Sequence, residues 1–333
     1  MTAVRRNARL TLGVFWLALT GCDARSQATL PSGALPPAPP AVTASTHAPS
    51  TTSASVAAAR STGAASSALP ELQVPASQVY EVSDLKPGEK RPLLIFLHGL
   101  GASGKIAFDV LHLAALGARE RVFVVAPDGA FDSQKRQFWN AGPACCNFDH
   151  ANVDDVARLG ALIDRLRARA GVDPARVYLA GHSNGGFMTE RLACAFGDRL
   201  AAAASLSGAA PTADITCDKP SGLALLEVHG DADEIVRYAG GRVFDNASLA
   251  PFPSAEQGFQ DWAKRFGCSG SAQSGTELDL DPKLPGTETS VEQFASCARG
   301  SVALWTVHGG SHYVGTGQQA FEAVWRFLSA HHQ

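Results

Sequence analysis

The chain has no excess of charge of either sign. Its 333 residues include 28 lysines and arginines against 31 aspartates and glutamates, which gives a formal net charge of −3 at pH 7. Proteins that bind nucleic acid carry a clustered excess of basic side chains. The composition therefore gives no electrostatic reason to expect a nucleic-acid partner.

Near its start the chain also lacks an apolar run long enough to cross a membrane. The run in residues 10–19 is about half the length of a transmembrane helix, which takes roughly 20 residues. It follows three arginines in residues 5–9, an arrangement typical of a secretory signal. The run ends in LTGC, which resembles the bacterial lipobox, so we predict a lipoprotein-type signal peptide in residues 1–22 with a lipid on Cys22. The alternative is an ordinary signal peptide in which Cys22 has no role.

Large apolar side chains are scarce in residues 23–70, where Ala, Ser, Thr and Pro dominate. Such a segment buries too little apolar surface to offset the entropy of folding, so we predict a disordered tether. Residues 71–333 remain, enough for one α/β domain with a sizeable core. We therefore expect an exported monomer of the bacterial cell envelope, facing the periplasm or the cell surface, or secreted. Its membrane contact would be limited to the N-terminal lipid.

No two cysteines have Cys-x-x-Cys spacing, so the sequence does not predict a zinc site. With Cys22 set aside, an even set of cysteines remains. An even set in an exported domain predicts disulfides, although the spacing alone leaves the pairing open. The set comprises Cys145, Cys146, Cys194, Cys217, Cys268 and Cys297.

Short apolar runs alternate with longer segments of helical periodicity, which predicts a mostly parallel, doubly wound α/β sheet. The predicted strands lie in residues 91–99, 121–129, 176–183, 200–208, 222–230 and 301–310. The predicted helices lie in residues 153–171, 185–198, 254–267 and 317–332. Residues 269–297 are polar and rich in Gly, Ser and Thr, so we expect a surface excursion there.

The segment GHSNG, residues 181–185, places Ser183 between a predicted strand and a predicted helix. Gly-x-Ser-x-Gly in this context predicts the nucleophile elbow of an α/β-hydrolase. The turn is so tight that a side chain at either glycine would clash, and the hydroxyl stands at a helix N-terminus that favours developing negative charge. A structural turn with an incidental hydroxyl is the alternative.

A serine nucleophile needs a base, and the base needs an acid that orients it. In this fold the acid and then the base follow the serine along the chain. Asp231 and Asp233 compete for the acid. We predict Asp233, which lies further into its loop and can reach back toward an imidazole, and we interpret Asp231 as a turn-capping residue.

Two histidines, His308 and His312, follow the last long strand and compete for the role of base. We predict His312, because the flexible Gly-Gly-Ser before it gives the reach to approach Ser183. We expect His182 to pack away from the serine and His229 to be a structural histidine of its turn.

An oxyanion hole in this fold uses the N–H after the nucleophile and one from the loop after an early strand. These predict the backbone N–H groups of Asn184 and Leu100. The alternative for the His98-Gly99 segment is a simple strand-terminating turn.

With these residues placed, residues 78–328 resemble the polyhydroxybutyrate depolymerase and feruloyl/acetylxylan esterase family of α/β-hydrolases. The motifs that carry the resemblance are LIFLHGLGASG, FWNAGPACCNFDHANVDDVARLGALID, GHSNGGFMTERLAC, EVHGDADEIVRYAGG and LWTVHGGSH. The resemblance supports Ser183, Asp233 and His312 as the triad.

The resemblance also implies roles and pairings that the residues alone do not. Trp139, Asn140 and the Asp154-Asp155 pair would shape or brace the site; otherwise Trp139 is an ordinary aromatic and the pair is the acidic first turn of a helix. Two disulfides are implied, Cys194–Cys217 and Cys268–Cys297, which leaves Cys145 and Cys146 as adjacent partners or free thiols.

The loop around His312 departs from the family pattern: it reads Gly-Gly-Ser-His-Tyr-Val-Gly instead of Gly-Gly-Gly-His-Thr-Trp-Pro. Tyr313, with Trp139 and Asn140, is therefore a candidate for contact with substrate, and the substrate itself stays open.

We predict a serine ester hydrolase that works through an acyl-enzyme and needs neither metal nor cofactor. Its substrate would be a small ester, a polyester or an esterified polysaccharide. The alternatives are a serine peptidase of the same fold and a non-catalytic envelope lipoprotein that binds a glycan or polymer.

Overall fold

The computed structural model describes residues 71–217, 222–294 and 296–333, which belong to one compact unit. The predicted signal peptide with Cys22 and the predicted tether in residues 23–70 lie outside the described residues. None of the helices in the described ranges is long and apolar enough to cross a bilayer.

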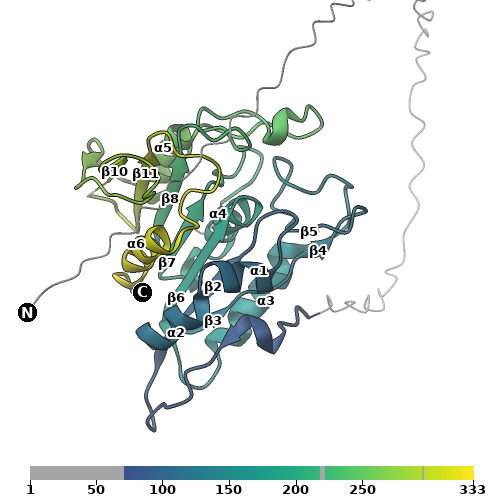
Figure 1. The fold of residues 1–333 in the computed structure, drawn as a ribbon, viewed down its shortest axis with the longest axis vertical. Helices are drawn as coiled ribbons and strands as arrows, with labels where there is room; N and C mark the ends of the chain where they lie inside the picture. The colour runs from purple at the N-terminus through teal and green to yellow at the C-terminus, as the bar shows by residue number, and fades with distance from the viewer. Residues whose placement is uncertain (1–70, 218–221, 295) are drawn as a thin grey trace, which may run out of the picture. The chain divides into compact units, whose positions relative to one another are not determined.

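A nine-stranded sheet runs through the domain in the order β1-β3-β2-β6-β7-β8-β11-β10-β9 (Figure 1). The six central strands are parallel, and β1, β10 and β9 join the two edges antiparallel. The central strands are β3 (Phe123–Val125), β2 (Arg91–Leu97), β6 (Val172–His182), β7 (Ala202–Leu206), β8 (Ala224–Gly230) and β11 (Ser301–Val307); the edge strands are β1 (Val79–Tyr80), β10 (Thr289–Gln293) and β9 (Gln273–Ser274). A separate hairpin joins β4 (Ala130–Phe131) and β5 (Gln137–Phe138).

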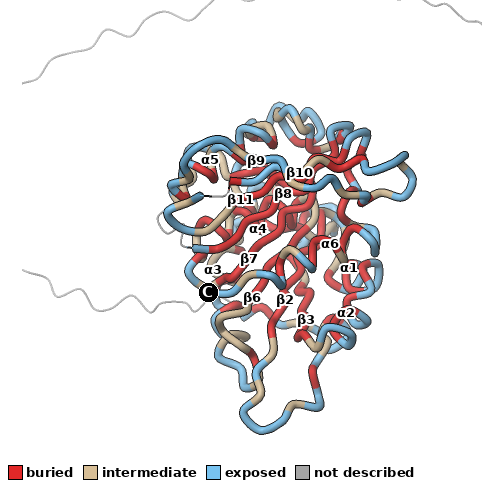
Figure 2. Tube along the Cα trace, turned by 90° about the vertical axis from the view of Figure 1, so that its left-hand side faces the viewer, coloured by how far each residue is buried: buried red, intermediate tan, exposed pale blue. Residues whose placement is uncertain are grey.

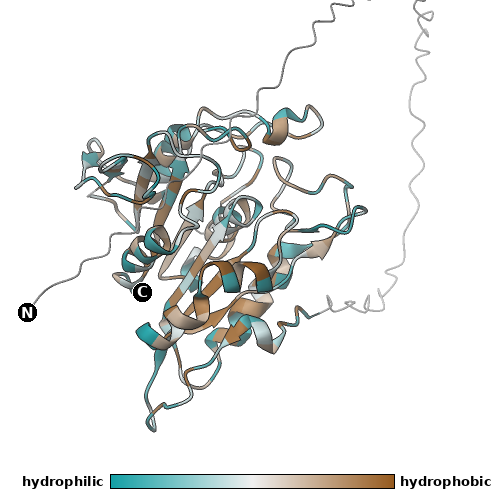
Figure 3. Cartoon of the chain, viewed as in Figure 1, coloured by the Kyte–Doolittle hydropathy of each residue, from teal (hydrophilic) through white to brown (hydrophobic). Residues whose placement is uncertain are grey.

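Helices cover both faces of the sheet. One face carries α3 (Asp155–Arg167), α4 (Asn184–Phe196) and α5 (Ala255–Phe266), and the other carries α1 (Gly104–Val110), α2 (Leu113–Glu120) and α6 (Gln318–Ser329). Successive residues of β2 point alternately into the two cores, Ile95 into the first and Phe96 into the second. The central strands are therefore largely buried on both sides (Figure 2) and largely hydrophobic (Figure 3), as expected of a parallel sheet; the first half of β6, which contains Asp173 and Arg176, is only half-buried.

The predicted fold class is confirmed, and all six predicted strands and all four predicted helices are present. Two expectations differ. Residues 104–120 form α1 and α2, which the sequence reading did not assign. Residues 269–297 are not only a surface excursion, because β9 and β10 lie there and extend the sheet beyond β11. Their polar sequence reflects an edge position with exposed residues on both sides.

A tight elbow joins β6 to α4 at Ser183. The backbone of Ser183 has φ 56° and ψ −120°, a conformation that costs a non-glycine residue about 1–3 kcal/mol. Its N–H donates to the Leu206 carbonyl of β7 at 2.8 Å, which holds the turn in place. A Cβ at Gly181 would overlap the Gly185 carbonyl, and a Cβ at Gly185 would overlap the carbonyl of Leu97. Both glycines are thus required by close backbone contact.

We predict that Gly185→Ala lowers the free energy of unfolding by about 2 kcal/mol or more, because backbone atoms of β2 cannot move aside as a side chain could. The matched control is Gly222→Ala, where a Cβ would meet nothing nearer than the Gly300 nitrogen at 4.0 Å. Thermal unfolding followed by circular dichroism compares the two. Equal melting temperatures would contradict the steric account of the elbow.

Candidate active site

Three side chains from distant parts of the chain meet at the carboxyl ends of the parallel strands. His312, after β11, has its Nε2 2.8 Å from the Oγ of Ser183 at the elbow. Its Nδ1 lies 2.7 Å from Oδ2 of Asp233, in the loop after β8. Strands β8 and β11 are parallel neighbours, so their loops emerge side by side. The structure therefore brings the predicted nucleophile, base and acid into one hydrogen-bonded line.

The two competing residues form a separate pair. Asp231 and His308 are joined by their Oδ2 and Nδ1 atoms at 2.9 Å, and the other oxygen of Asp231 accepts the Gly309 N–H at 2.6 Å. Both side chains are exposed to solvent, unlike those of Asp233 and His312. Asp231 is thus a turn-capping residue as expected, but the turn that its side chain caps is the one after β11.

Asp233 is held as a carboxylate. Its Oδ1 accepts the N–H groups of Ile235 at 2.8 Å and Val236 at 2.9 Å. Burial alone would raise the pKa of Asp233, but hydrogen bonds from His229 and His312 outweigh it and hold the pKa well below its usual range. An ionised acid at this position fixes the tautomer of His312 with its proton on Nδ1, so that Nε2 faces Ser183 as an acceptor.

Two backbone N–H groups near Ser183 are free to stabilise an oxyanion. In the loop after β2, Gly101 donates to Gln137 and Ala102 to Gly99, while Leu100 donates to no acceptor among the described residues. Asn184 is the first residue of α4, so its N–H has no partner within the helix. The β2 loop is close to the elbow, because a Cβ at Gly99 would lie 3.4 Å from the Cβ of Ser183.

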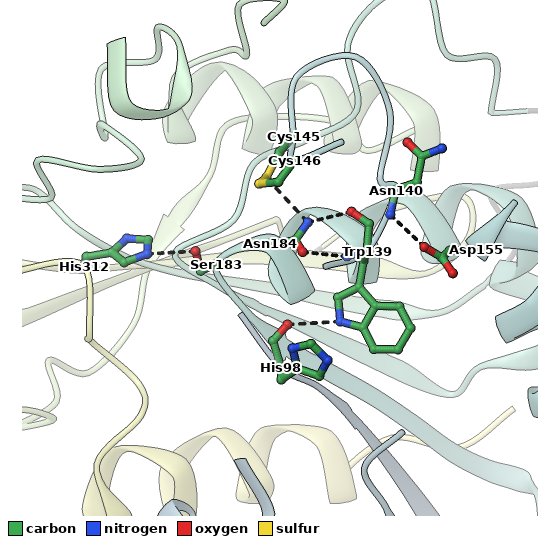
Figure 4. The surroundings of a disulfide bond; sticks show 9 residues. All are labelled: His98, Trp139, Asn140, Cys145, Cys146, Asp155, Ser183, Asn184 and His312. Atoms are coloured by element: carbon green, nitrogen blue, oxygen red, sulfur yellow. Dashed lines mark hydrogen bonds between the residues drawn. A yellow bond between two sulfur atoms is a disulfide. The ribbon is translucent and has the colours of Figure 1, made fainter. Parts of the chain in front are cut away.

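Two hydrogen bonds to the backbone of Trp139 fix the side chain of Asn184. Its Oδ1 accepts the Trp139 N–H at 2.7 Å, and its Nδ2 donates to the Trp139 carbonyl at 2.8 Å (Figure 4). The indole of Trp139 in turn donates to the His98 carbonyl at 3.0 Å. Trp139 is fully buried, so the candidate role in substrate contact gives way to a bracing role: it ties the elbow to the β2 loop.

Asn140 is also part of this brace. Its N–H donates to Asp155 Oδ2 at 2.8 Å, and its side chain donates to the Val153 carbonyl at 2.8 Å. Asp154 instead belongs to the start of a helix, the alternative expected for the acidic pair. Its side chain caps α3 by accepting the N–H of Ala157 at 2.9 Å. Asp155 is buried and braces the site region, whereas Asp154 is a helix cap.

The side chain of His182 contacts the loop that carries His312, and among the described residues it makes no hydrogen bond to Ser183. Its Nε2 lies 2.8 Å from the carbonyl of His312, and its ring stacks on Tyr313 with centroids 5.7 Å apart. Burial, with the nearby His312, lowers the pKa of His182 to about 4. The neutral ring therefore donates from Nε2 and steadies the loop that carries His312.

An apolar cavity of about 240 Å³ opens beside the elbow. It is bordered by Gly99 and His182 on the side of Ser183 and by Ile106 and Val110 of α1 and Tyr313 on the outer side. These last three side chains are exposed, although large and hydrophobic. The sequence reading missed α1 and so missed this wall of the site; only Tyr313 was a candidate.

All six remaining cysteines form disulfides. Cys194–Cys217 and Cys268–Cys297 are the pairs that the family resemblance implied, and Cys145 pairs with its neighbour Cys146. The adjacent pair is buried, with Cys145 Sγ 3.5 Å from Asn184 Nδ2 (Figure 4). Among the described residues, no group of three or more His, Cys, Asp or Glu side chains is arranged to hold a metal ion.

Comparison with known proteins agrees with this geometry. A family described as Phospholipase/Carboxylesterase matches residues 81–257. Feruloyl esterase B of Piromyces equi is 31% identical over 242 residues, which are 71% of this chain and 42% of that protein. Poly(3-hydroxyalkanoate) depolymerase C of Paucimonas lemoignei is 29% identical over 140 residues, 39% of this chain and 32% of that protein. This chain thus spans less than half the length of both relatives.

A solved structure shares the fold. The acetyl xylan esterase from Aspergillus awamori has a TM-score of 0.54 at 14% sequence identity, over 75% of this chain and 93% of that one. At this identity the likeness concerns the arrangement of the sheet and helices alone.

The line of Ser183, His312 and Asp233 predicts a reactive serine. A fluorophosphonate should label Ser183, and His312→Ala should slow labelling by at least about 10³-fold, because the hydroxyl loses its base. His308→Ala is the matched control, since it removes the imidazole of the neighbouring pair, and it should label like the wild type. Mass spectrometry of the labelled peptide measures both. Equal labelling of the two variants would contradict the assignment.

Proposed function

The chain belongs to the phospholipase/carboxylesterase family of α/β-hydrolases, and from that premise we propose that it is an exported serine esterase. The hydrogen-bonded line from Ser183 through His312 to Asp233 carries the proposal. Three disulfides in the described residues support an oxidising compartment, in keeping with a lipid-bearing Cys22 at the cell envelope.

In the proposed reaction, Ser183 Oγ attacks the carbonyl carbon of an ester while His312 Nε2 takes its proton. The resulting oxyanion accepts hydrogen bonds from the N–H groups of Leu100 and Asn184. His312 then gives the proton to the departing alcohol, which leaves an acyl group on Ser183. Water, activated by the same imidazole, releases the acid and restores the serine. Asp233 stays ionised and balances the imidazolium that forms twice in each cycle.

The apolar cavity supports a substrate with an uncharged, hydrophobic group next to its ester. Among the described residues, no lysine, arginine, aspartate or glutamate lines it, and burial keeps the pKa of both its histidines, His98 and His182, below the usual range. Aromatic acids such as ferulate, hydroxybutyrate units and short aliphatic acids all meet this description. Acetylated polysaccharide would leave the cavity unused.

The experiment that tests the proposal compares p-nitrophenyl esters with aminoacyl p-nitroanilides. We expect the esters to be hydrolysed and the anilides to be spared, and Ser183→Ala to lose at least about 10³-fold in kcat/KM. Cleavage of anilides in preference to esters would favour a peptidase. Polymer or glycan binding that is unchanged in Ser183→Ala, without turnover of any ester, would favour the non-catalytic alternative.

A second prediction concerns the cavity. Ile106→Asp places a charge on its outer wall, so kcat/KM for octanoate esters should fall by about tenfold while that for acetate esters changes little, since a hydrophobic contact worth about 1.4 kcal/mol is lost. Phe131→Asp is the matched control, because Phe131 is equally apolar and exposed but does not line the cavity. Equal losses for both esters, or for both variants, would contradict the assigned cavity.

A further inference from the structure

A second histidine, His229, contacts the same oxygen of Asp233 as His312 does. His229 lies in β8, only 1% exposed, between Glu227 of the same strand and the loop that carries Asp233. The proposed reaction gives it no role. It is a structural histidine of its turn in that it contacts the Val236 carbonyl, but it also contacts the two buried carboxyl groups of Glu227 and Asp233.

Both ring nitrogens of His229 face oxygen acceptors. Its Nε2 lies 2.7 Å from the Val236 carbonyl and 3.5 Å from Asp233 Oδ2. Its Nδ1 lies 3.1 Å from Glu227 Oε1. A carbonyl oxygen can only accept, so Nε2 carries a proton. The remaining proton lies between Nδ1 and Glu227, and its position decides whether the ring is an imidazolium beside a carboxylate or a neutral ring beside a carboxylic acid.

The charge on Asp233 decides between these states. Among the described residues, the salt-bridge partners of Asp233 are the two imidazoles of His229 and His312. His312 must be neutral at the start of the reaction, because it accepts the serine proton. A nearby positive charge stabilises a buried carboxylate, and among the described residues His229 is the salt-bridge partner of Asp233 that can carry one while His312 is neutral.

The hydrogen bonds of His229 favour a charge on its ring. Burial opposes a charge on His229, but hydrogen bonds with Asp233 and Glu227 outweigh it and raise the pKa of His229 to about 10. Burial raises the pKa of Glu227, while the His229 ring acts against that rise. On α4, burial and the Glu227 carboxylate raise the pKa of Glu190 to about 8, so that Glu190 is protonated at neutral pH.

Among the described residues, no side chain other than Glu227 and Asp233 forms a salt bridge with His229. Tyr238 meets the ring edge-on at 5.7 Å and is engaged with Thr306. Arg265 of α5 acts on Glu190, which lies behind Glu227. Glu190 itself accepts the indole N–H of Trp262 at 2.8 Å.

We propose that His229 is a buried imidazolium, balanced by Glu227, that acts as a positioning residue for Asp233. It holds the carboxylate ionised and oriented toward His312 before any charge develops there. The line of contacts would then run from Ser183 through His312, Asp233 and His229 to Glu227. The proposal rests on the proposed esterase function for its catalytic meaning, but the charge state of His229 can be measured without turnover.

The first test is spectroscopic. In Ser183→Ala, a histidine-selective ¹H–¹⁵N spectrum at neutral pH should show both nitrogens of His229 protonated, with the signal assigned by its loss in His229→Gln. An unprotonated Nδ1 would overturn the proposal, because the proton would then sit on Glu227. If the wild-type protein hydrolysed no ester, the proposed function would be wrong, but the measured protonation state of His229 would still stand.

The second test is the pH profile of kcat/KM, which reports the free enzyme. Without the cation at His229, the negative charge of Asp233 stabilises the protonated form of His312 more strongly, so His312 loses its Nε2 proton less readily. The acid limb should therefore move to higher pH by about one unit in His229→Gln. Glu227→Gln should move it in the same direction, because a neutral amide cannot balance an imidazolium. A purely structural histidine would lower kcat without moving the limb.

Glu190→Gln is the matched control, because it changes an equally buried carboxyl group that is already protonated. The acid limb of its kcat/KM profile should stay at the wild-type pH. If Glu227→Gln leaves the limb unchanged, Glu227 already carries the proton and the proposal is wrong. Equal shifts in all three variants would also overturn it. Melting temperatures of each variant confirm that the folded enzyme is being measured.

Discussion

The hydrogen bond between Ser183 Oγ and His312 Nε2 joins segments 129 residues apart, and most of the architecture serves to hold its two ends together. Parallel β6, β7, β8 and β11 deliver their carboxyl ends to one edge of the sheet. The elbow lifts the serine off that edge, at a cost in backbone strain that the close contacts of Gly181 and Gly185 offset. His182 holds the loop of His312 through a hydrogen bond to the His312 carbonyl. Trp139 joins the elbow to the loop that contains Leu100 through its hydrogen bonds with Asn184 and His98.

Burial makes the electrostatics of the site strong. Asp233 sits among donors that keep it ionised, and His229 contacts the same carboxylate oxygen as His312. The exposed pair Asp231–His308 has the same chemistry but little burial, and so it remains a turn cap. The two pairs therefore differ in burial and in contact with Ser183, which His312 reaches, and both differences are properties of the fold and not of the local motif.

Much of this arrangement could be predicted from the sequence. The apolar strands, the amphipathic helices and Gly-x-Ser-x-Gly follow short-range rules, and they were sufficient to predict the fold and Ser183. The α1 helix was missed because Ile106 and Val110 face outward, so its apolar residues do not form a single stripe. The edge strand β10 is polar because little covers it. The contact of Trp139 with Asn184, 45 residues apart, depends on tertiary packing that no spacing in the chain reveals. His229 and Asp233 are only four residues apart, but the burial of both side chains also comes from the tertiary fold.

The central claim is that an ester is opened by Ser183 with the acyl group left on its oxygen. Rapid mixing with p-nitrophenyl butyrate, acid quenching and mass spectrometry of the digested protein measure that intermediate directly. The account predicts a burst of p-nitrophenol of about one equivalent per chain and a butyryl group on the peptide that contains Ser183, absent in Ser183→Ala. Turnover with a butyryl group on another residue, or turnover that survives in Ser183→Ala, would contradict it.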